Sequence, residues 1–231
     1  MERRDFLKLG LTLPLLFLIP RFNIFYFKKK VYLTIDDGPG KYHKEILKIL
    51  GQENKATFFM LGHKLNDKNK YDLTCRTLEA GHEIGNHSYT HPRFSSISLD
   101  EVKIEIERTH QLIDRAYSTV GRTNPCLFRF PYGDLGDKLT EPINENQEFD
   151  KKEKISGLLK MLGYTSYRWN VDSEDYRYYL DNDKRISLDR IMGNVKSAGD
   201  GDIVLVHDLS ITAKNIIPFY VESGKYELVT L

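Results

Sequence analysis

Short apolar segments alternate with amphipathic stretches from residue 31 to the end of the chain. The candidate strands cover residues 31–35, 56–61, 82–86, 127–130, 165–171, 202–206 and 226–231. Helical patterns such as KEILKIL (44–50) and ISLDRIMGNVKSAG (186–199) lie between them. Strands separated by helices predict βαβ units and a parallel sheet, and many such repeats curl the sheet toward a barrel. We therefore predict an α/β fold, a distorted (β/α) barrel of about seven strands.

The clearest helical pattern begins at Leu99 and ends at Val120. Ser98 and Glu101 form a capping-box pattern at its start. Its apolar residues recur at steps of three and four, as on one face of a helix; they are Leu99, Val102, Ile106, Ile113, Ala116 and Val120. Residues 136–154 are mostly polar, and we predict a long surface loop there, before a helix at 155–162.

The first thirty residues differ from the rest of the chain. An uncharged run of 12 residues separates Lys8 from Arg21, which is short of the roughly 20 residues that span a bilayer as a helix. Such a run after a basic start is typical of an export signal, and the early Arg-Arg pair resembles a twin-arginine signal; a generic basic start explains it equally well. No small-residue cleavage site follows, so a retained membrane anchor is the alternative. We predict that residues 1–30 contact the export machinery or the membrane and that residues 31–231 form one domain in the periplasm or cell envelope.

The charges of the chain are nearly balanced. Its 231 residues include 34 Lys and Arg and 33 Asp and Glu, for a formal net charge of +1. No basic field therefore indicates a nucleic-acid partner, and the frequent charges exclude a protein that spans a membrane many times. Cys75 and Cys126 are the only cysteines, and their spacing leaves open whether they form a disulfide.

Chemically reactive residues follow the ends of five predicted strands. The carboxyl ends of parallel strands meet at one edge of a sheet, where ligands and catalytic residues gather. We therefore expect one shared site, despite the wide separation of its members in sequence. The strand-end groups are Asp36-Asp37, His87, Arg129 with Pro131-Tyr132-Gly133, Asp172 with Asp175, and His207-Asp208.

His87 and His91 are a candidate metal-binding pair. In extended chain their imidazoles would lie roughly 13 Å apart, so we predict that the segment coils into a helical turn that ends at Pro92. Two imidazoles and one carboxylate leave a coordination position open, as in catalytic zinc sites. The alternative is that His87 and His91 are two unrelated surface histidines. The other reactive residues at strand ends argue against this alternative.

Asp36 and Asp37 are adjacent on a predicted strand. Neighbouring side chains on a strand point to opposite faces, so both carboxylates can serve one site only if the chain bends there. Gly38-Pro39 supplies the predicted bend. An ordinary acidic turn is the alternative.

Five sequence motifs resemble, in order, those of the NodB-homology polysaccharide deacetylases, carbohydrate esterase family 4. They are TIDDGP (34–39), HSYTH (87–91), RFPY (129–132), DSEDY (172–176) and LVH (205–207). The resemblance covers about residues 31–231. It implies a NodB-type barrel and a catalytic divalent metal, with Zn²⁺ first and Co²⁺ or Ni²⁺ as alternatives.

The resemblance also implies roles for the matching residues. Asp37, His87 and His91 would hold the metal. Asp36 would take a proton from water as the general base, and His207 would protonate the departing amine.

Further residues would support this chemistry. Asp175 would orient His207 and stabilise its charge, and Arg129 would hold Asp36 ionised and in place. The backbone N–H of Tyr132 would contribute to the oxyanion hole, and Leu205 would shape the pocket for the acetyl methyl group.

Two aromatic positions bear on the substrate groove. The family usually has Trp where this chain has Tyr176, which we expect to contact the substrate. Trp169 lies on a predicted strand, and we expect it in the core because an indole buries a large apolar area.

We predict a metal-dependent hydrolase that removes N-acetyl groups from amino sugars of a cell-envelope polysaccharide. Peptidoglycan is the leading substrate, ahead of chitin-like glycans and poly-N-acetylglucosamine, and an O-acetyl ester of xylan is a further alternative. A hydrolase of another amide and a non-catalytic glycan-binding protein are the rival interpretations.

Overall fold

The computed structural model describes residues 27–136, 145–181 and 184–231. Most of the predicted export segment therefore lies outside the described residues. Within the described ranges, no helix combines the length and the apolar character needed to cross a membrane.

A parallel sheet forms the centre of the molecule, and β1 (Lys29–Gly38) is its central strand. The start of β1 pairs with β8 (Tyr226–Val229), whereas its later residues pair with β7 (Ile203–His207) on one side and β2 (Thr57–Met60) on the other. This arrangement buries the middle of β1 between neighbours, which explains the mostly apolar run at residues 31–35.

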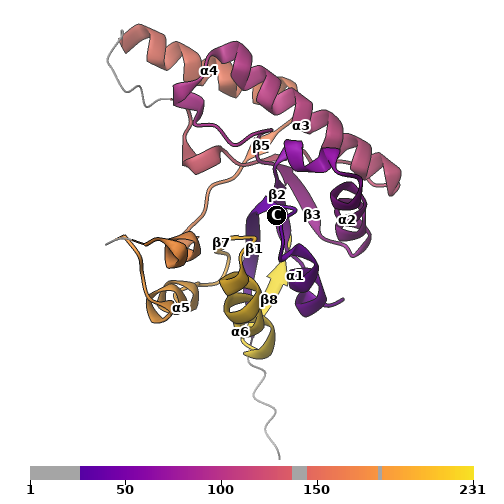
Figure 1. Ribbon diagram of the computed structural model, residues 1–231, viewed down its shortest axis with the longest axis vertical. Coiled ribbons are helices and arrows are strands. Elements are labelled where there is room, and N and C mark those ends of the chain that lie inside the picture. Colours follow the sequence, from indigo (N-terminus) through magenta and orange to yellow (C-terminus); the bar gives the residue numbers. More distant parts are fainter. Residues whose placement is uncertain (1–26, 137–144, 182–183) are drawn as a thin grey trace, which may run out of the picture.

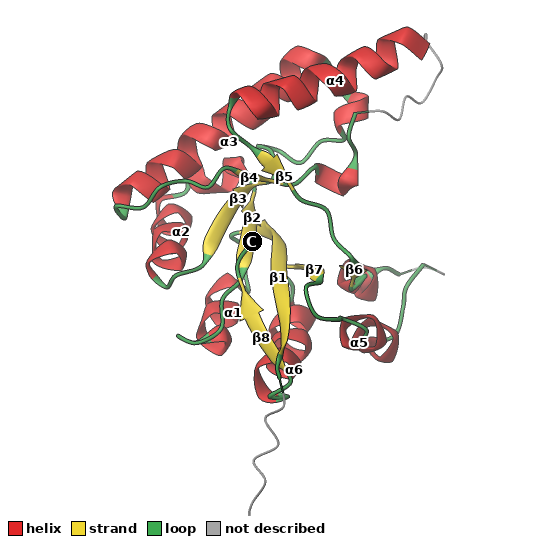
Figure 2. Ribbon diagram, turned by 180° about the vertical axis from the view of Figure 1, so that it is seen from behind, coloured by secondary structure: helices red, strands yellow, loops and turns green. Residues whose placement is uncertain are grey.

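The remaining strands extend the sheet in both directions. Beyond β2 lie β3 (Glu83–Asn86), β4 (Leu127–Phe128) and β5 (Thr165–Ser166), and beyond β7 lies β6 (Val171–Asp172). All the paired strands are parallel. The sheet curls into an incomplete barrel with β5 and β6 at opposite ends of the strand order (Figure 2). The predicted α/β fold with a distorted barrel is confirmed.

The predicted strand at 165–171 is two strands rather than one. The N–H of Tyr167 donates to the carbonyl of Phe128 on one end of the sheet, whereas the N–H of Asn170 donates to the carbonyl of Ile203 on the other. The chain therefore crosses the open side of the barrel between β5 and β6. A local sequence pattern cannot show this crossing, because each half pairs with a different distant strand.

Helices surround the sheet (Figure 1). The longest, α3, lies beside α4 across one end of the sheet, and α1 and α6 pack together near β8. A π-helical turn (Thr212–Ile216) leads into α6. The helices are α1 (His43–Leu50), α2 (Lys68–Glu79), α3 (Leu99–Thr119), α4 (Glu145–Met161), α5 (Leu188–Lys196) and α6 (Ile217–Glu222).

The helix predicted from the 99–120 pattern is confirmed, with its capping box. The Ser98 hydroxyl accepts from the N–H of Glu101, and the Glu101 carboxylate accepts from the N–H of Ser98. The loop predicted at 136–154 is wrong in its second half, because α4 begins at Glu145. The early turns of α4 are rich in polar residues in the sequence, and among the side chains that the structure describes in this helix Ile155 and Leu159 are the buried apolar ones.

The apolar core has two parts. The larger lies between the sheet and α1, α2, α5 and α6, and the smaller lies where α3 and α4 meet the strand end at Phe128. Cys75 is a buried residue of α2, Cys126 is half-buried before β4, and both are free thiols. The sequence left open whether these two cysteines form a disulfide, and in the structure they do not.

Candidate active site

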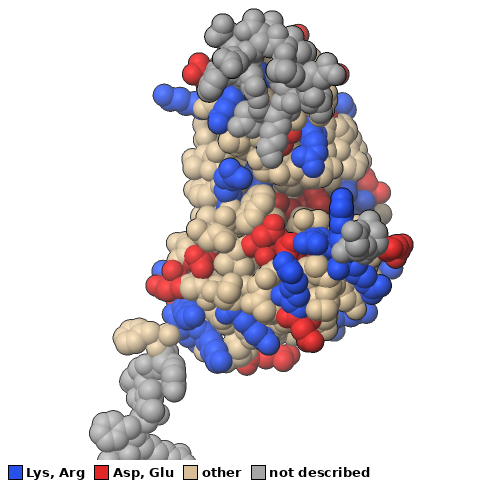
Figure 3. Space-filling view, turned by 90° about the vertical axis from the view of Figure 1, so that its left-hand side faces the viewer, with Lys and Arg blue, Asp and Glu red and all other residues tan. Residues whose placement is uncertain are grey.

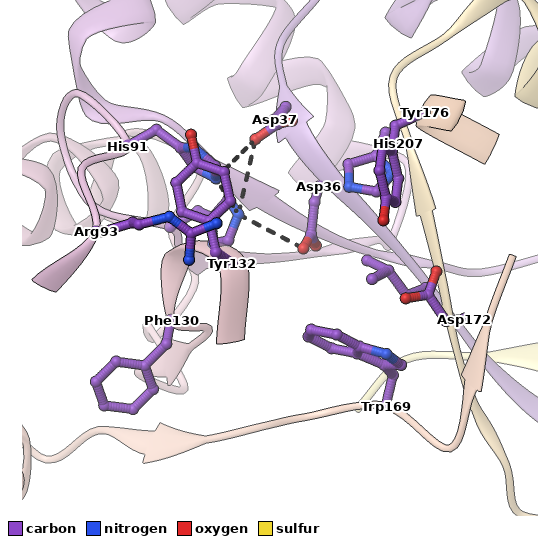
Figure 4. Close-up of a pocket in the computed structure, with 12 residues that line it drawn as sticks. Asp36, Asp37, His91, Arg93, Phe130, Tyr132, Trp169, Asp172, Tyr176 and His207 are labelled. Atoms are coloured by element: carbon purple, nitrogen blue, oxygen red, sulfur yellow. Dashed lines mark hydrogen bonds and ion pairs between the residues drawn. The ribbon is translucent and has the colours of Figure 1, made fainter. Parts of the chain in front are cut away.

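A pocket of about 530 Å³ opens at the carboxyl ends of the strands. Eight of the ten predicted site residues line it, and Arg129 and Asp175 lie behind its wall. Figure 4 shows that the side chains converge from several strand ends. The lining residues are Asp36, Asp37, His87, His91, Arg93, Phe130, Tyr132, Trp169, Asp172, Tyr176, Leu205 and His207.

The two neighbouring carboxylates reach the pocket because the strand is irregular at Asp37. The register of β1 against β2 shifts between Asp36 and Gly38, and Asp37 adopts a left-handed conformation with φ of 66°. The ammonium group of Lys64 donates to the carbonyl oxygen of Asp37 at 2.6 Å and so holds this turn. The predicted bend exists, but it begins at Asp37 and not at Gly38-Pro39.

The segment from His87 to His91 forms a compact turn, but not the predicted helical one. Ser88 and His91 have positive φ values of 67° and 68°, and the N–H of His91 donates to the Ser88 hydroxyl. The Glu105 carboxylate of α3 accepts from the N–H groups at 89 and 90. The turn brings the Nε2 atoms of His87 and His91 to 3.2 Å. Glu105 was not predicted from the sequence, because the pattern of an amphipathic helix does not show which distant backbone groups its glutamates contact.

The donor atoms of Asp37, His87 and His91 fit a divalent metal. They lie within 4.8 Å of one another, and Oδ1 of Asp37 is buried without a hydrogen-bond partner. Nδ1 of His87 lies 2.8 Å from the carbonyl oxygen of Arg129, which places the proton on Nδ1 and leaves the Nε2 lone pair free. Burial lowers the pKa of His91 and lowers that of His87 to about 3. Both imidazoles are therefore neutral, as metal ligands must be.

Asp36 is fixed by Arg129, which is only 1% exposed. The guanidinium donates to Oδ1 of Asp36 at 2.9 Å and to the Thr34 hydroxyl at 2.6 Å. Oδ2 of Asp36 is left facing Nε2 of His87 at 3.5 Å. Burial raises the pKa of Asp36, and Arg129 offsets only part of that effect. The free oxygen of Asp36 thus lies beside the candidate metal ligands, with a raised proton affinity.

His207 is held by Asp175 on the other side of the pocket. Nδ1 of His207 lies 2.6 Å from Oδ1 of Asp175, and the second carboxylate oxygen accepts from the Thr212 hydroxyl and from the backbone N–H of His207. Although burial lowers the pKa of His207, the carboxylates of Asp175, Asp36 and Asp37, Asp175 foremost, together outweigh it and raise the pKa to about 9. Asp36 and His207 are register partners across β1 and β7, so the two side chains face the same pocket.

Aromatic and apolar side chains complete the walls. Leu205 is buried, Tyr132 and Tyr176 are 56% and 46% exposed, and the Tyr176 ring meets the His207 ring edge to face at 5.5 Å. Trp169 lines the pocket and is only half-buried, so its predicted place in the core is wrong. Because the strand breaks before β6, the indole turns toward the opening of the barrel.

Two lining residues, Arg93 and Phe130, were not predicted from the sequence as part of the site, whereas Asp172 was expected there without a specific role. Arg93 comes two residues after His91, and this proximity to a candidate metal ligand could have identified it from the sequence. Figure 3 shows a face on which acidic side chains gather in a central hollow, with Lys and Arg side chains around them. Within the pocket the carboxylates are Asp36, Asp37 and Asp172, and Arg93 adds a cation at the exposed edge.

Residues 27–148, more than half of the chain, match the family model described as "Polysaccharide deacetylase". This chain belongs to the polysaccharide deacetylase family. The fold agrees, because the chain is similar to a family 4 carbohydrate esterase from Streptomyces lividans, solved in complex with acetate. The TM-score is 0.66 at 29% identity, over 87% of this chain and 91% of that one.

Among named members of the polysaccharide deacetylase family, the chain is similar to two that act on peptidoglycan. It is 33% identical to the peptidoglycan-N-acetylmuramic acid deacetylase PdaC of Bacillus subtilis, over 88% of this chain and 38% of that protein. It is 32% identical to a peptidoglycan-N-acetylglucosamine deacetylase of Bacillus cereus, over 79% of this chain and 57% of that protein. The chain thus spans between about two fifths and three fifths of the length of these relatives.

Proposed function

We propose that the chain is a metal-dependent hydrolase that removes N-acetyl groups from amino sugars of a cell-envelope polysaccharide. The observation that carries this proposal is that Asp36 and His207, register partners on adjacent strands, line one pocket beside three convergent metal-ligand side chains. A base and an acid in one cavity are what hydrolysis of an amide requires.

Asp37, His87 and His91 would hold the metal, with Zn²⁺ first and Co²⁺ or Ni²⁺ as alternatives. When bound, such an ion supplies a Lewis acid that polarises a carbonyl oxygen and lowers the pKa of water. The neutral imidazoles and the partnerless Oδ1 of Asp37 support this assignment.

Asp36 would act as the general base. Its Oδ1 is occupied by Arg129, so Oδ2 takes the proton from a water molecule that adds to the amide carbon. The backbone N–H of Tyr132, a pocket residue in a left-handed conformation with φ of 57°, would stabilise the oxygen that gains negative charge. Leu205 lies where it can contact the acetyl methyl group.

His207 would act as the general acid. Its Nδ1 is tied to Asp175, so Nε2 delivers the proton to the amine nitrogen as the carbon–nitrogen bond breaks. Water is thereby divided between the products, which are acetate and a free amine. A pKa of about 9 keeps His207 protonated for this step at neutral pH.

Peptidoglycan is the proposed substrate, ahead of chitin-like glycans and poly-N-acetylglucosamine. The names of the relatives above support this order. We further propose that residues 31–231 are the catalytic domain, that it acts in the periplasm or cell envelope, and that residues 1–30 serve as an export signal or membrane anchor.

The test is acetate release from a panel of peptidoglycan, chitooligosaccharides, poly-N-acetylglucosamine and acetylated xylan, with and without a chelator. Asp36→Asn and His207→Ala should each lower the rate by at least about a hundredfold, as loss of a general base or acid does, while the metal content is retained. Asp189→Asn and His110→Ala, which change the same residue types outside the pocket, should leave the rate unchanged. Full activity in either pocket variant would contradict the roles. Glycan binding without metal or acetate release would favour the rival glycan-binding protein.

A further inference from the structure

Arg93 lies at the exposed edge of the pocket, two residues after His91. Its guanidinium carbon is 4.2 Å from the centre of the Tyr132 ring, and that ring is in turn 4.5 Å from the His91 ring. Figure 4 shows Arg93 stacked on Tyr132 on the His91 side of the pocket. Stacking on an aromatic face restrains a flexible side chain, so the cation is held close to the candidate metal ligands.

The pocket carboxylates have other partners. Asp36 is paired with Arg129, Asp37 faces the two imidazoles, and Asp172 accepts from the N–H of Glu174. Among the described residues, no carboxylate forms an ion pair with Arg93. Its five donors are therefore available to a ligand, and a planar guanidinium matches a carboxylate through two parallel hydrogen bonds.

The position of Arg93 relative to the reacting group indicates which part of a ligand it can meet. In the proposed function the acetamide lies against the metal ligands and the backbone of Tyr132. Arg93 stacks on the side chain of that same tyrosine. A substituent on a sugar carbon next to the acetamido carbon is the part of such a ligand that could reach the guanidinium.

We propose that Arg93 binds a free carboxylate carried on the sugar carbon beside the acetamide. The preferred substrate is then an acidic N-acetylated amino sugar, such as one with a lactyl ether next to the acetamide, and not a neutral N-acetylglucosamine. This inference rests on the proposed deacetylase function. It also implies that masking the carboxylate as an ester or amide weakens recognition, because the ion pair is lost.

The test uses glycan strands of alternating N-acetylglucosamine and N-acetylmuramic acid with free carboxylates, the same strands after methyl esterification, and a neutral chitooligosaccharide. Mass spectrometry identifies which sugar loses its acetyl group, and acetate release gives kcat/KM. The wild-type chain should favour the free acid over the ester by about tenfold or more, which is typical for a hydrogen bond to a charged group.

Arg93→Gln should bring the ratio of the two rates close to one, and Arg93→Lys should keep part of the preference. Because each variant is judged by a ratio of two substrates, a partial loss of folded protein does not affect the result. Arg115→Gln is the matched control, since Arg115 also stacks on a tyrosine, Tyr71 at 4.7 Å, away from the pocket. It should keep the full preference.

The outcomes separate the two proposals. Equal rates on acid and ester in the wild-type chain, or a preference that survives in Arg93→Gln, would overturn the role of Arg93 alone. Acetate release from only the neutral oligosaccharide would do the same and leave the deacetylase function standing. No acetate from any of the three substrates would overturn the deacetylase function and, with it, the inference.

Discussion

Asp36 and Asp37 are neighbours in the chain but contact different partners, because the backbone turns at Asp37. Asp36 keeps the register of β1 and pairs with Arg129, whereas the left-handed Asp37 faces the two imidazoles. A regular strand would separate the two carboxylates onto opposite faces of the sheet. At the scale of the residue, one irregular backbone position thus decides whether the proposed base and a candidate metal ligand can share a pocket.

The Asp175–His207 pair leads to a prediction about pH. His207 must be protonated to act as an acid, so kcat/KM should fall as the pH rises through about 9. In Asp175→Asn the largest of the charges that raise the pKa of His207 is gone, while burial still lowers it. The alkaline limb of the pH profile should therefore move down by more than about one unit.

The control for this prediction is Thr212→Val, which removes a hydrogen bond to Asp175 and keeps the carboxylate charge. Its alkaline limb should move much less. An unchanged alkaline limb in Asp175→Asn would show that a group other than His207 sets it.

At the scale of the element, α3 links local sequence to the site. Its capping box fixes its first turn, its apolar face packs against the sheet, and Glu105 in its second turn holds the turn that carries His91. The capping box and the apolar face are readable from sequence, because both depend on residues three or four apart. The contact of Glu105 is not readable, because its partners belong to another element.

Ser98→Ala should destabilise the folded chain by ~1 kcal/mol, since it removes the side-chain cap of α3. For a domain of this size we expect Tm to fall by about 2–4 °C. Ser118→Ala is the control, because Ser118 is exposed near the other end of the same helix. Equal Tm values for the two variants, measured by thermal unfolding, would contradict a role of the cap in stability.

At the scale of the whole molecule, the candidate metal ligands come from two separate parts of the chain. Asp37 ends β1, and His87 and His91 follow β3, so only the folded sheet brings them together. The unfolded chain lacks this arrangement. A metal ion should therefore stabilise the folded state by mass action.

Zn²⁺ at a hundredfold excess over its Kd should add about 2.7 kcal/mol of stability, which corresponds to a rise in Tm of about 5–10 °C. A chelator should reverse the rise. His91→Ala should lose most of this increment, whereas His110→Ala, outside the pocket, should keep it. An increment in His91→Ala equal to that of the wild-type chain would exclude His91 as a ligand.

Sequence by itself determined the α/β class, the longest helix and most of the residues that gather at the site. These features are recorded in local periodicity and in reactive residues at strand ends, and parallel pairing brings such ends to one edge. The break between β5 and β6, the start of α4 and the place of Trp169 in the pocket were decided by tertiary structure, because each depends on contacts with distant segments. The same holds for Arg93. Its position after His91 is visible in the sequence, but only the fold stacks it on Tyr132 and leaves its guanidinium without a carboxylate partner among the described residues.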